Sequence, residues 1–389
     1  MKDFERKVAH SLVLLSSALL VTTVQAAGTI KIDDTRSVTI GGGMRAGFAM
    51  TENGAPNGTD DSKDFSLQSA RLYISGNASD KIKFTFNTEC KGCVFGSQDA
   101  AGSGGDIDVL DAIAQFELNP KFNIWVGRML TPADRIEMNG PYYGLTWNQY
   151  TVPLLPSDQT GQAGLLGRDD GVTVWGGVGK FAYAAGLFKG LQGGANQKDS
   201  PLFATRLSFS FLGKEDNPAY YTSSTYFGGG GDIATLGFVY QKQSDGTGTA
   251  TQPGDFDATI LDFLYEKSID KGKSAFTVEA EYKKFNADLT PIAKASAGCF
   301  CLFDGKSYFV TAAYLLPSAG KVKWQPYIRH TSNEPTTGAS SDLNELGLNM
   351  IMKGHNARMN VSYTDGDANL SGAAGTDAHT LSFGVQIQI

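Results

Sequence analysis

Apolar and polar residues alternate along most of the chain, and this alternation predicts β-strands rather than helices. The closing stretch "LSFGVQIQI" places Leu381, Phe383 and Val385 on one parity and Ser382 and Gln386 on the other. The same period of two recurs in "TVEAEYKKF", "KVKWQPYIR" and "NELGLNMIMK". Because successive side chains of a strand point to opposite faces, each stretch predicts a strand with one apolar and one polar face.

The connectors between these stretches alternate in length. Short connectors are expected at 77–80, 270–273, 318–321 and 354–356, and long ones at 53–64, 91–106, 130–168, 244–255, 286–305 and 333–341. Strands of about ten residues, with short turns on one side and long loops on the other, are typical of outer-membrane barrels. We therefore expect an all-β fold, a transmembrane antiparallel β-barrel of about 16 strands whose apolar faces contact outer-membrane lipid.

The expected strands span residues 36–51, 65–76, 81–90, 107–118, 122–129, 169–178, 181–190, 203–212, 233–243, 256–268, 274–285, 306–316, 321–332, 342–353, 357–366 and 378–389. One connector does not fit the pattern. Residues 213–232 lie on the short-turn side but are long. Either this turn is unusual, or its "AYYTSSTYF" belongs to a further strand and the strand count changes.

The first 26 residues have the features of a secretory signal. Lys2 and Arg6 precede the apolar run "LVLLSSALLV", and "VQA" fits a small-residue cleavage site. A buried helix is the alternative interpretation. We expect residues 1–26 to be a cleaved signal peptide and residues 27–389 to form one barrel domain in the outer membrane of a Gram-negative type of cell.

Composition and charge exclude several classes of function. The 47 glycines, 23 phenylalanines and 15 tyrosines suit many short strands and turns. A net charge of −7 argues against a nucleic-acid partner. The mature histidines are scattered, with His330 and His355 expected to be solvated, and no nucleophile–base arrangement is recognisable. We therefore expect neither an enzyme nor a bound metal or cofactor.

Particular segments resemble the phosphate-selective porin O and P family. The likeness lies in "FSLQSARLYISGNASDKIKFTFNTE", with its Ala70-Arg71-Leu72 centre and Gly76 before the hairpin, and in "VGRMLTPADRIEMNG" and "GRDDGVTVWG". This resemblance implies a 16-stranded barrel that assembles as a homotrimer. It also implies that the third external loop folds into the lumen as a constriction.

The third loop is unusually aromatic. Tyr142, Tyr143, Trp147 and Tyr150 would pack an inserted loop against the barrel wall, because an aromatic surface outside the barrel would be costly to expose. Asp134, Arg135 and Glu137 would then face the water path. The alternative is that the aromatic residues, together with Trp125 and Trp175, form an interfacial girdle or a trimer contact.

The residues expected to line the pore carry both signs of charge. The candidates for the pore lining and constriction are Arg45, Arg71, Lys83, Arg135, Glu137 and Arg168. Selective anion passage needs a field of a single sign, so this mixture argues against phosphate selectivity. We expect an outer-membrane porin for passive diffusion of ions and small hydrophilic solutes. The alternative is a barrel that acts as a scaffold or sleeve for a redox partner such as a cytochrome.

Four cysteines form two close pairs, Cys90 with Cys93 and Cys299 with Cys301. An exported protein can form disulfides. Two disulfides in external loops are the first expectation, and a four-thiolate metal site or free thiols are the alternatives.

Overall fold

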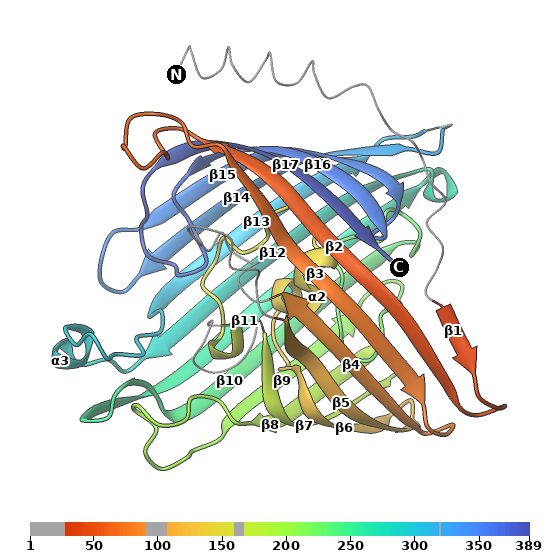
Figure 1. Cartoon of the computed structure of the whole chain (residues 1–389), viewed down its shortest axis with the longest axis horizontal. Helices are drawn as coiled ribbons and strands as arrows, with labels where there is room; N and C mark the ends of the chain where they lie inside the picture. Colours follow the sequence, from red (N-terminus) through yellow and green to blue (C-terminus); the bar gives the residue numbers. More distant parts are fainter. Residues whose placement is uncertain (1–27, 91–106, 159–166, 319) are drawn as a thin grey trace.

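A closed ring of strands makes up most of the structure. The computed structural model describes residues 28–90, 107–158, 167–318 and 320–389. Within these residues, sixteen consecutive antiparallel strands pair neighbour to neighbour, and β17 closes the ring on β2. Figure 1 shows the tilted strands of this barrel. The predicted 16-stranded barrel is confirmed, whereas the signal peptide predicted for residues 1–26 lies outside the described residues.

The strands of the ring are β2(Ser37–Thr51), β3(Asp64–Asn77), β4(Ile82–Cys90), β5(Ile107–Asn119), β6(Phe122–Leu130), β7(Arg168–Val178), β8(Phe181–Phe188), β9(Leu202–Ser210), β10(Ile233–Thr249), β11(Gln252–Ile269), β12(Ser274–Ala287), β13(Gly305–Leu315), β14(Lys323–Pro335), β15(Ser341–Lys353), β16(Ala357–Gly366) and β17(Ala378–Gln388). A short additional strand, β1(Gly28–Lys31), pairs with β2 from Gly28 opposite Ile40. It occupies the part of the β2 edge that β17 leaves uncovered, because the β17 pairing reaches only to Gly43.

The alternation in sequence becomes an apolar outside and a polar inside. On β12, Phe276 and Tyr282 are about 40% exposed, whereas Glu279 and Lys283 between and beside them are buried. The other strands repeat this arrangement, with exposed side chains that include Phe84, Val126, Phe238, Val310, Ile328 and Leu346. A belt of aliphatic and aromatic side chains around a polar interior is the arrangement that lipid requires.

In the described ranges, helices are few and short. They are α2(Arg135–Tyr143) and α3(Pro291–Lys294), with 3-10 turns at Pro156–Asp158 and Asp270–Gly272. In the part of the chain that the structure describes, no helix has both the length and the apolar character needed to cross a membrane.

The prediction of a long loop at 244–255 is wrong. β10 and β11 continue as a hairpin as far as the pair Thr249–Gln252, with a register shift between Gln243 and Thr247. The backbone of Phe300, from the next external loop, exchanges two hydrogen bonds of 2.9 Å with Gly248. The composition of this segment is typical of a turn. The strands could not be predicted from it because Phe300, a residue distant in sequence, completes the backbone pairing.

The connector at 213–232 is an unusual turn and not a strand, so the strand count stands. Residues 211–232 join β9 to β10 without contributing a strand to the ring. Their Tyr220 belongs to a buried apolar cluster with Trp125 of β6 and Met138 of α2. The connector and the segment 131–157 therefore pack against each other and against the inner wall.

Candidate pore constriction

Segment 131–157 begins where β6 ends and turns at once into helix α2. The carboxylate of Asp134 caps this helix by accepting a hydrogen bond of 3.1 Å from the backbone N–H of Glu137. An N-cap carboxylate satisfies an otherwise unpaired helix donor. Gly140 adopts a positive φ of 56°, which breaks the helix immediately before Pro141. In Figure 1, α2 is drawn within the outline of the barrel.

One end of α2 is held by buried ion pairs. The ammonium group of Lys283 on β12 lies 2.8 Å from Asp134 and 2.9 Å from Glu137. Glu137 also accepts the backbone N–H of Leu155 at 3.1 Å, which joins the two ends of the segment. Burial raises the pKa of Asp134 to about 7, as does the charge of Glu137, while Lys283 acts in the opposite direction.

Arg135 forms a second buried anchor. Its guanidinium donates two hydrogen bonds of 2.7 Å to the carboxylate of Glu215 in the connector, and its Nε lies 3.4 Å from Asp262 on β11. Burial alone would raise the pKa of Glu215, but the neighbouring Arg135 holds it below its ordinary value. Asp134, Arg135 and Glu137 are therefore paired and at most 2% exposed, so the expectation that they face the water path is wrong.

These charged side chains can be buried because the barrel wall and the connector hold charges of opposite sign at the same place. Taking an ion out of water is costly unless a partner of opposite charge and hydrogen bonds replace the solvent. Lys283, Asp262 and Glu215 supply those partners, and none of them is near α2 in sequence.

The opposite side of the segment meets two arginines. Arg45 on β2 donates to the carbonyl oxygens of Pro141 at 2.6 Å and Trp147 at 2.7 Å, and its guanidinium lies 4.0 Å above the Trp147 ring. Arg358 on β16 donates to the carbonyl of Gly144 at 2.6 Å and lies 5.9 Å from the same ring. Both guanidiniums therefore bind backbone carbonyl oxygens rather than carboxylates.

Gly384 on β17 makes room for Trp147. A Cβ atom added at Gly384 would lie 2.1 Å from the Trp147 ring, much closer than any real contact. The indole therefore lies directly against the backbone of the wall, which only glycine permits at this position.

Arg71 and Tyr142 form a neighbouring group. Arg71 on β3 lies opposite Gly43 on β2, and its Nε is 2.5 Å from Glu89 on β4. The hydroxyl of Tyr142 donates to Ser69 at 3.0 Å, and the Arg71 guanidinium lies 5.0 Å from the Tyr142 ring. Arg45 and Arg71 therefore both contact segment 131–157 from adjacent strands.

The other two predicted pore-lining residues do not join this group. Arg168, at the start of β7, pairs with Asp111 at 2.9 Å. Lys83 on β4 pairs with Glu117 and is 37% exposed. Neither side chain has a described hydrogen bond or ion pair with residues 131–157.

The four loop aromatics divide into buried and half-exposed residues. Tyr142 and Trp147 are 1% and 4% exposed, as expected for residues packed on the wall. Tyr150 packs against the cluster that contains Ile136 and Phe309. Tyr143 is 42% exposed and its ring is 5.1 Å from His355.

The girdle interpretation is wrong for Trp125. Its ring is 3% exposed and lies 5.4 Å from Tyr220 and 5.8 Å from Tyr221, both in the connector. Its position on the inward parity of β6 places it among interior residues rather than at a lipid interface.

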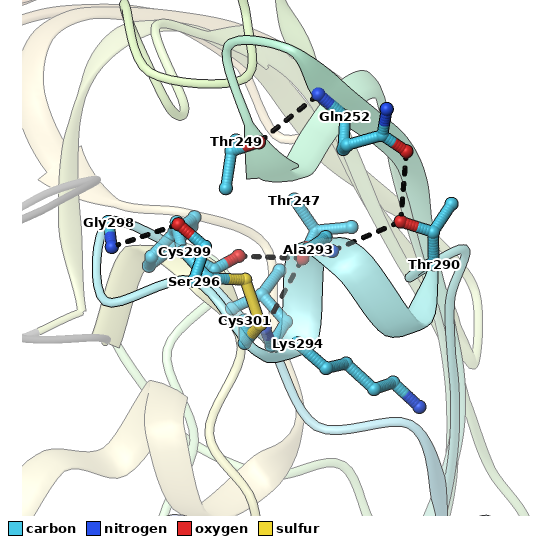
Figure 2. The surroundings of a disulfide bond; sticks show 12 residues. Thr247, Thr249, Gln252, Thr290, Ala293, Lys294, Ser296, Gly298, Cys299 and Cys301 are labelled. Carbon is cyan, nitrogen blue, oxygen red and sulfur yellow. Dashed lines mark hydrogen bonds between the residues drawn. A yellow bond between two sulfur atoms is a disulfide. The ribbon is translucent and has the colours of Figure 1, made fainter.

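A disulfide joins Cys299 and Cys301 in the loop after β12 (Figure 2). The Phe300 carbonyl between them accepts the hydroxyl of Thr247 at 2.7 Å, which fastens this loop to the β10–β11 hairpin. Cys93 lies outside the described residues, so its predicted partnership with Cys90 stays a prediction. Among the described residues, no group of three or more histidine, cysteine or carboxylate side chains is arranged to hold a metal ion.

Sequence reasoning missed the connector as part of this site. Glu215 and the run Thr222–Thr225 contact α2 or the wall. The prediction that His355 is solvated is wrong. Instead, the His355 Nε2 lies 2.9 Å from the Thr225 carbonyl and its ring lies 4.7 Å from Phe227. The features of the sequence that could have indicated this role are the length of the connector and its content of aromatic and hydroxyl side chains.

The barrel, its lipid-facing belt and its polar interior define an outer-membrane channel. The sequence profile of the phosphate-selective porin O and P family matches residues 38–389, and the chain belongs to this family. Its fold and family are those of a channel rather than an enzyme, and they place it in the outer membrane.

Solved structures share the fold at low sequence identity. An anion-selective porin from Comamonas acidovorans is 15% identical, with a TM-score of 0.58 over 91% of this chain and 100% of that one. The trimer form of in-vitro folded OmpT from Vibrio cholerae is 15% identical, with a TM-score of 0.55 over 92% and 100%. The outer-membrane channel DcaP of Acinetobacter baumannii is 10% identical, with a TM-score of 0.54 over 92% and 99%. No protein of curated function matches the chain.

Proposed function

We propose that this porin is a channel of weak charge selectivity for ions and small hydrophilic solutes, and not a phosphate filter. Segment 131–157 is the third external loop, folded into the lumen, where it forms the constriction. Its contacts with β2, β9 and β12, on widely separated parts of the ring, support this assignment. None of the comparisons supports the alternative of a sleeve for a redox partner.

The observation that carries the proposal is the pairing of interior charges. Most interior cations have a carboxylate within 3 Å, through the pairs Arg71–Glu89, Arg135–Glu215, Arg168–Asp111, Arg206–Asp262, Lys283–Asp134 and Arg329–Glu345. A row of neutralised cations cannot supply the single-sign field that selective anion passage requires. Among the described residues, no carboxylate forms an ion pair with Arg45 or Arg358, so these two arginines retain a local attraction for anions.

Planar-bilayer recording tests this function. The wild-type channel is expected to show open current, a small reversal potential in a potassium chloride gradient and no block by inorganic phosphate. Arg45→Glu is expected to shift the reversal potential toward cations, and Arg45→Gln by about half as much. Lys121→Glu is the matched control, since Lys121 is exposed in a turn outside the lumen. The absence of open current, or block by micromolar phosphate, contradicts the proposal.

We also propose that the protein is a homotrimer and that residues 1–26 are removed on export. The support is the family to which the chain belongs and the trimer form described for OmpT. Mass measurement of the mature protein in detergent, intact and dissociated, tests both statements.

A further inference from the structure

The connector between β9 and β10 does not extend away from the barrel. Its two ends meet at its base, where the Gly213 N–H donates to the Asp232 carbonyl at 2.8 Å. Beyond this base, Thr222, Ser223, Ser224 and Thr225 are at most 8% exposed. A polar run of this kind becomes buried only if another part of the protein satisfies its hydrogen bonds.

Helix α2 satisfies several of these bonds. Arg135 donates to the Ser223 carbonyl at 2.8 Å in addition to its bidentate pair with Glu215. The Thr222 hydroxyl donates to the Arg135 carbonyl at 2.7 Å, and Asn139 donates to the Ser224 hydroxyl at 2.6 Å. The inserted external loop and the connector from the other side of the barrel therefore meet.

The wall satisfies the rest. Glu266 on β11 accepts the Thr225 hydroxyl at 2.8 Å and the backbone N–H groups of Tyr226 and Gly228 at 3.0 and 2.9 Å. Glu279 on β12 accepts the Ser224 hydroxyl at 2.5 Å. These carboxylates point inward from the barrel wall, so the tip of the connector lies across the inner face of β11 and β12.

The connector also leaves a space beside it. Gly228 and Gly231 both have a φ of 76°, a backbone conformation that glycine adopts readily. A cavity lies between the connector and strands β8 to β10, lined by Ala182, Ser208 and Tyr220 among others. The connector is therefore bound through its tip and through Glu215, while a space remains between it and this part of the wall.

We propose that residues 211–232 are a plug that narrows the lumen from the short-turn side and sets the conductance together with the third external loop. This inference rests on the proposed channel function and extends it. The plug is held by the Arg135–Glu215 pair and by the carboxylates of Glu266 and Glu279.

Removing the plug is the direct test. Residues 214–231 are replaced by Asn-Gly, because Gly213 and Asp232 already form a hydrogen-bonded pair that a two-residue turn can close. Folding is verified by the compact, heat-sensitive migration of the barrel in an unheated detergent gel. The expected result is at least a twofold rise in single-channel conductance. A folded deletion variant with wild-type conductance overturns the plug.

A point variant separates the anchor from general damage. Glu215→Gln keeps the size of the side chain but loses the charge that faces Arg135, so we expect at least tenfold more transitions to a larger conductance. Asp216→Asn is the matched control, because Asp216 is exposed on the same connector. Equal transition rates in Glu215→Gln and Asp216→Asn overturn the anchoring role. Open current in the wild type with a larger current in the deletion variant supports the plug, whereas current in none of the proteins overturns the channel function itself.

Discussion

Lys283→Met is the sharpest test of how the third loop is held. The Lys283 ammonium is buried and lies 2.8 Å from Asp134, 2.9 Å from Glu137 and 3.0 Å from the Pro153 carbonyl. Methionine fills similar space but leaves three carboxylates, those of Asp134, Glu137 and Glu281, without their shared cation. Removing one partner of a buried ion pair costs about 3–5 kcal/mol. Since ~1.4 kcal/mol corresponds to a factor of ten, the detached state of the loop should gain roughly two to four powers of ten in population.

The pH dependence of this effect has a definite sign. Burial and the charge of Glu137 raise the pKa of Asp134 to about 7, so this carboxyl is largely protonated at pH 6 and ionised at pH 8. Lys283 lowers this pKa, so the pKa of Asp134 rises further in Lys283→Met. A neutral Asp134 needs no cation, so the variant should be less disruptive at pH 6 than at pH 8. The expected result is a channel with many more conductance steps than wild type at pH 8, and fewer of these steps at pH 6.

Single-channel recording at the two pH values measures the step frequency. Lys284→Met is the matched control, because Lys284 is the next residue on β12 and is exposed on the outer face. If Lys283→Met and Lys284→Met show the same step frequency at both pH values, the ion pairs do not hold the loop and the reasoning fails.

Two further predictions concern the same constriction. In the wild type, lowering the pH from 8 to 6 adds a proton at Asp134, so the reversal potential should shift toward anions. Asp134→Asn should remove this shift in reversal potential. If the shift persists in the variant, another group titrates in this range. Gly384→Ala places a methyl group 2.1 Å from the Trp147 ring, so the indole must move, at a cost of about 1–3 kcal/mol for overpacking. Tryptophan fluorescence should become more accessible to acrylamide in this variant but not in Gly28→Ala, where nothing lies within 4 Å, and equal quenching in both would count against the packing described.

The ring of strands could be predicted because its signal is local. The alternation on residues 357–366 is a property of that stretch alone, and the structure has β16 at Ala357–Gly366. The alternation of short and long connectors then indicated an outer-membrane barrel, in which the apolar face of each strand contacts lipid. The extended β10–β11 hairpin could not be predicted, because Gly248 is paired by the backbone of Phe300, a residue that its own neighbourhood does not indicate.

Only part of the membership of the site was predictable from the sequence, and its pairing was not. Arg45, Arg71, Arg135 and Glu137 all take part in contacts between the loop and the wall or the connector, as a loop rich in aromatic and charged residues suggested. The sequence does not show that Glu215 is the partner of Arg135, since 80 residues separate the two. The exposure expected for the charged residues of α2 was wrong for the same reason.

The sequence by itself determined a β-barrel with an apolar exterior and an interior of mixed charge, because a period of two assigns each side chain to a face without knowledge of distant contacts. Only the tertiary structure decided which charges neutralise each other and that residues 211–232 turn inward to meet the third loop. These choices depend on the closure of the ring, which brings β2, β12 and β16 around a common lumen and lets a buried charge find its partner across it.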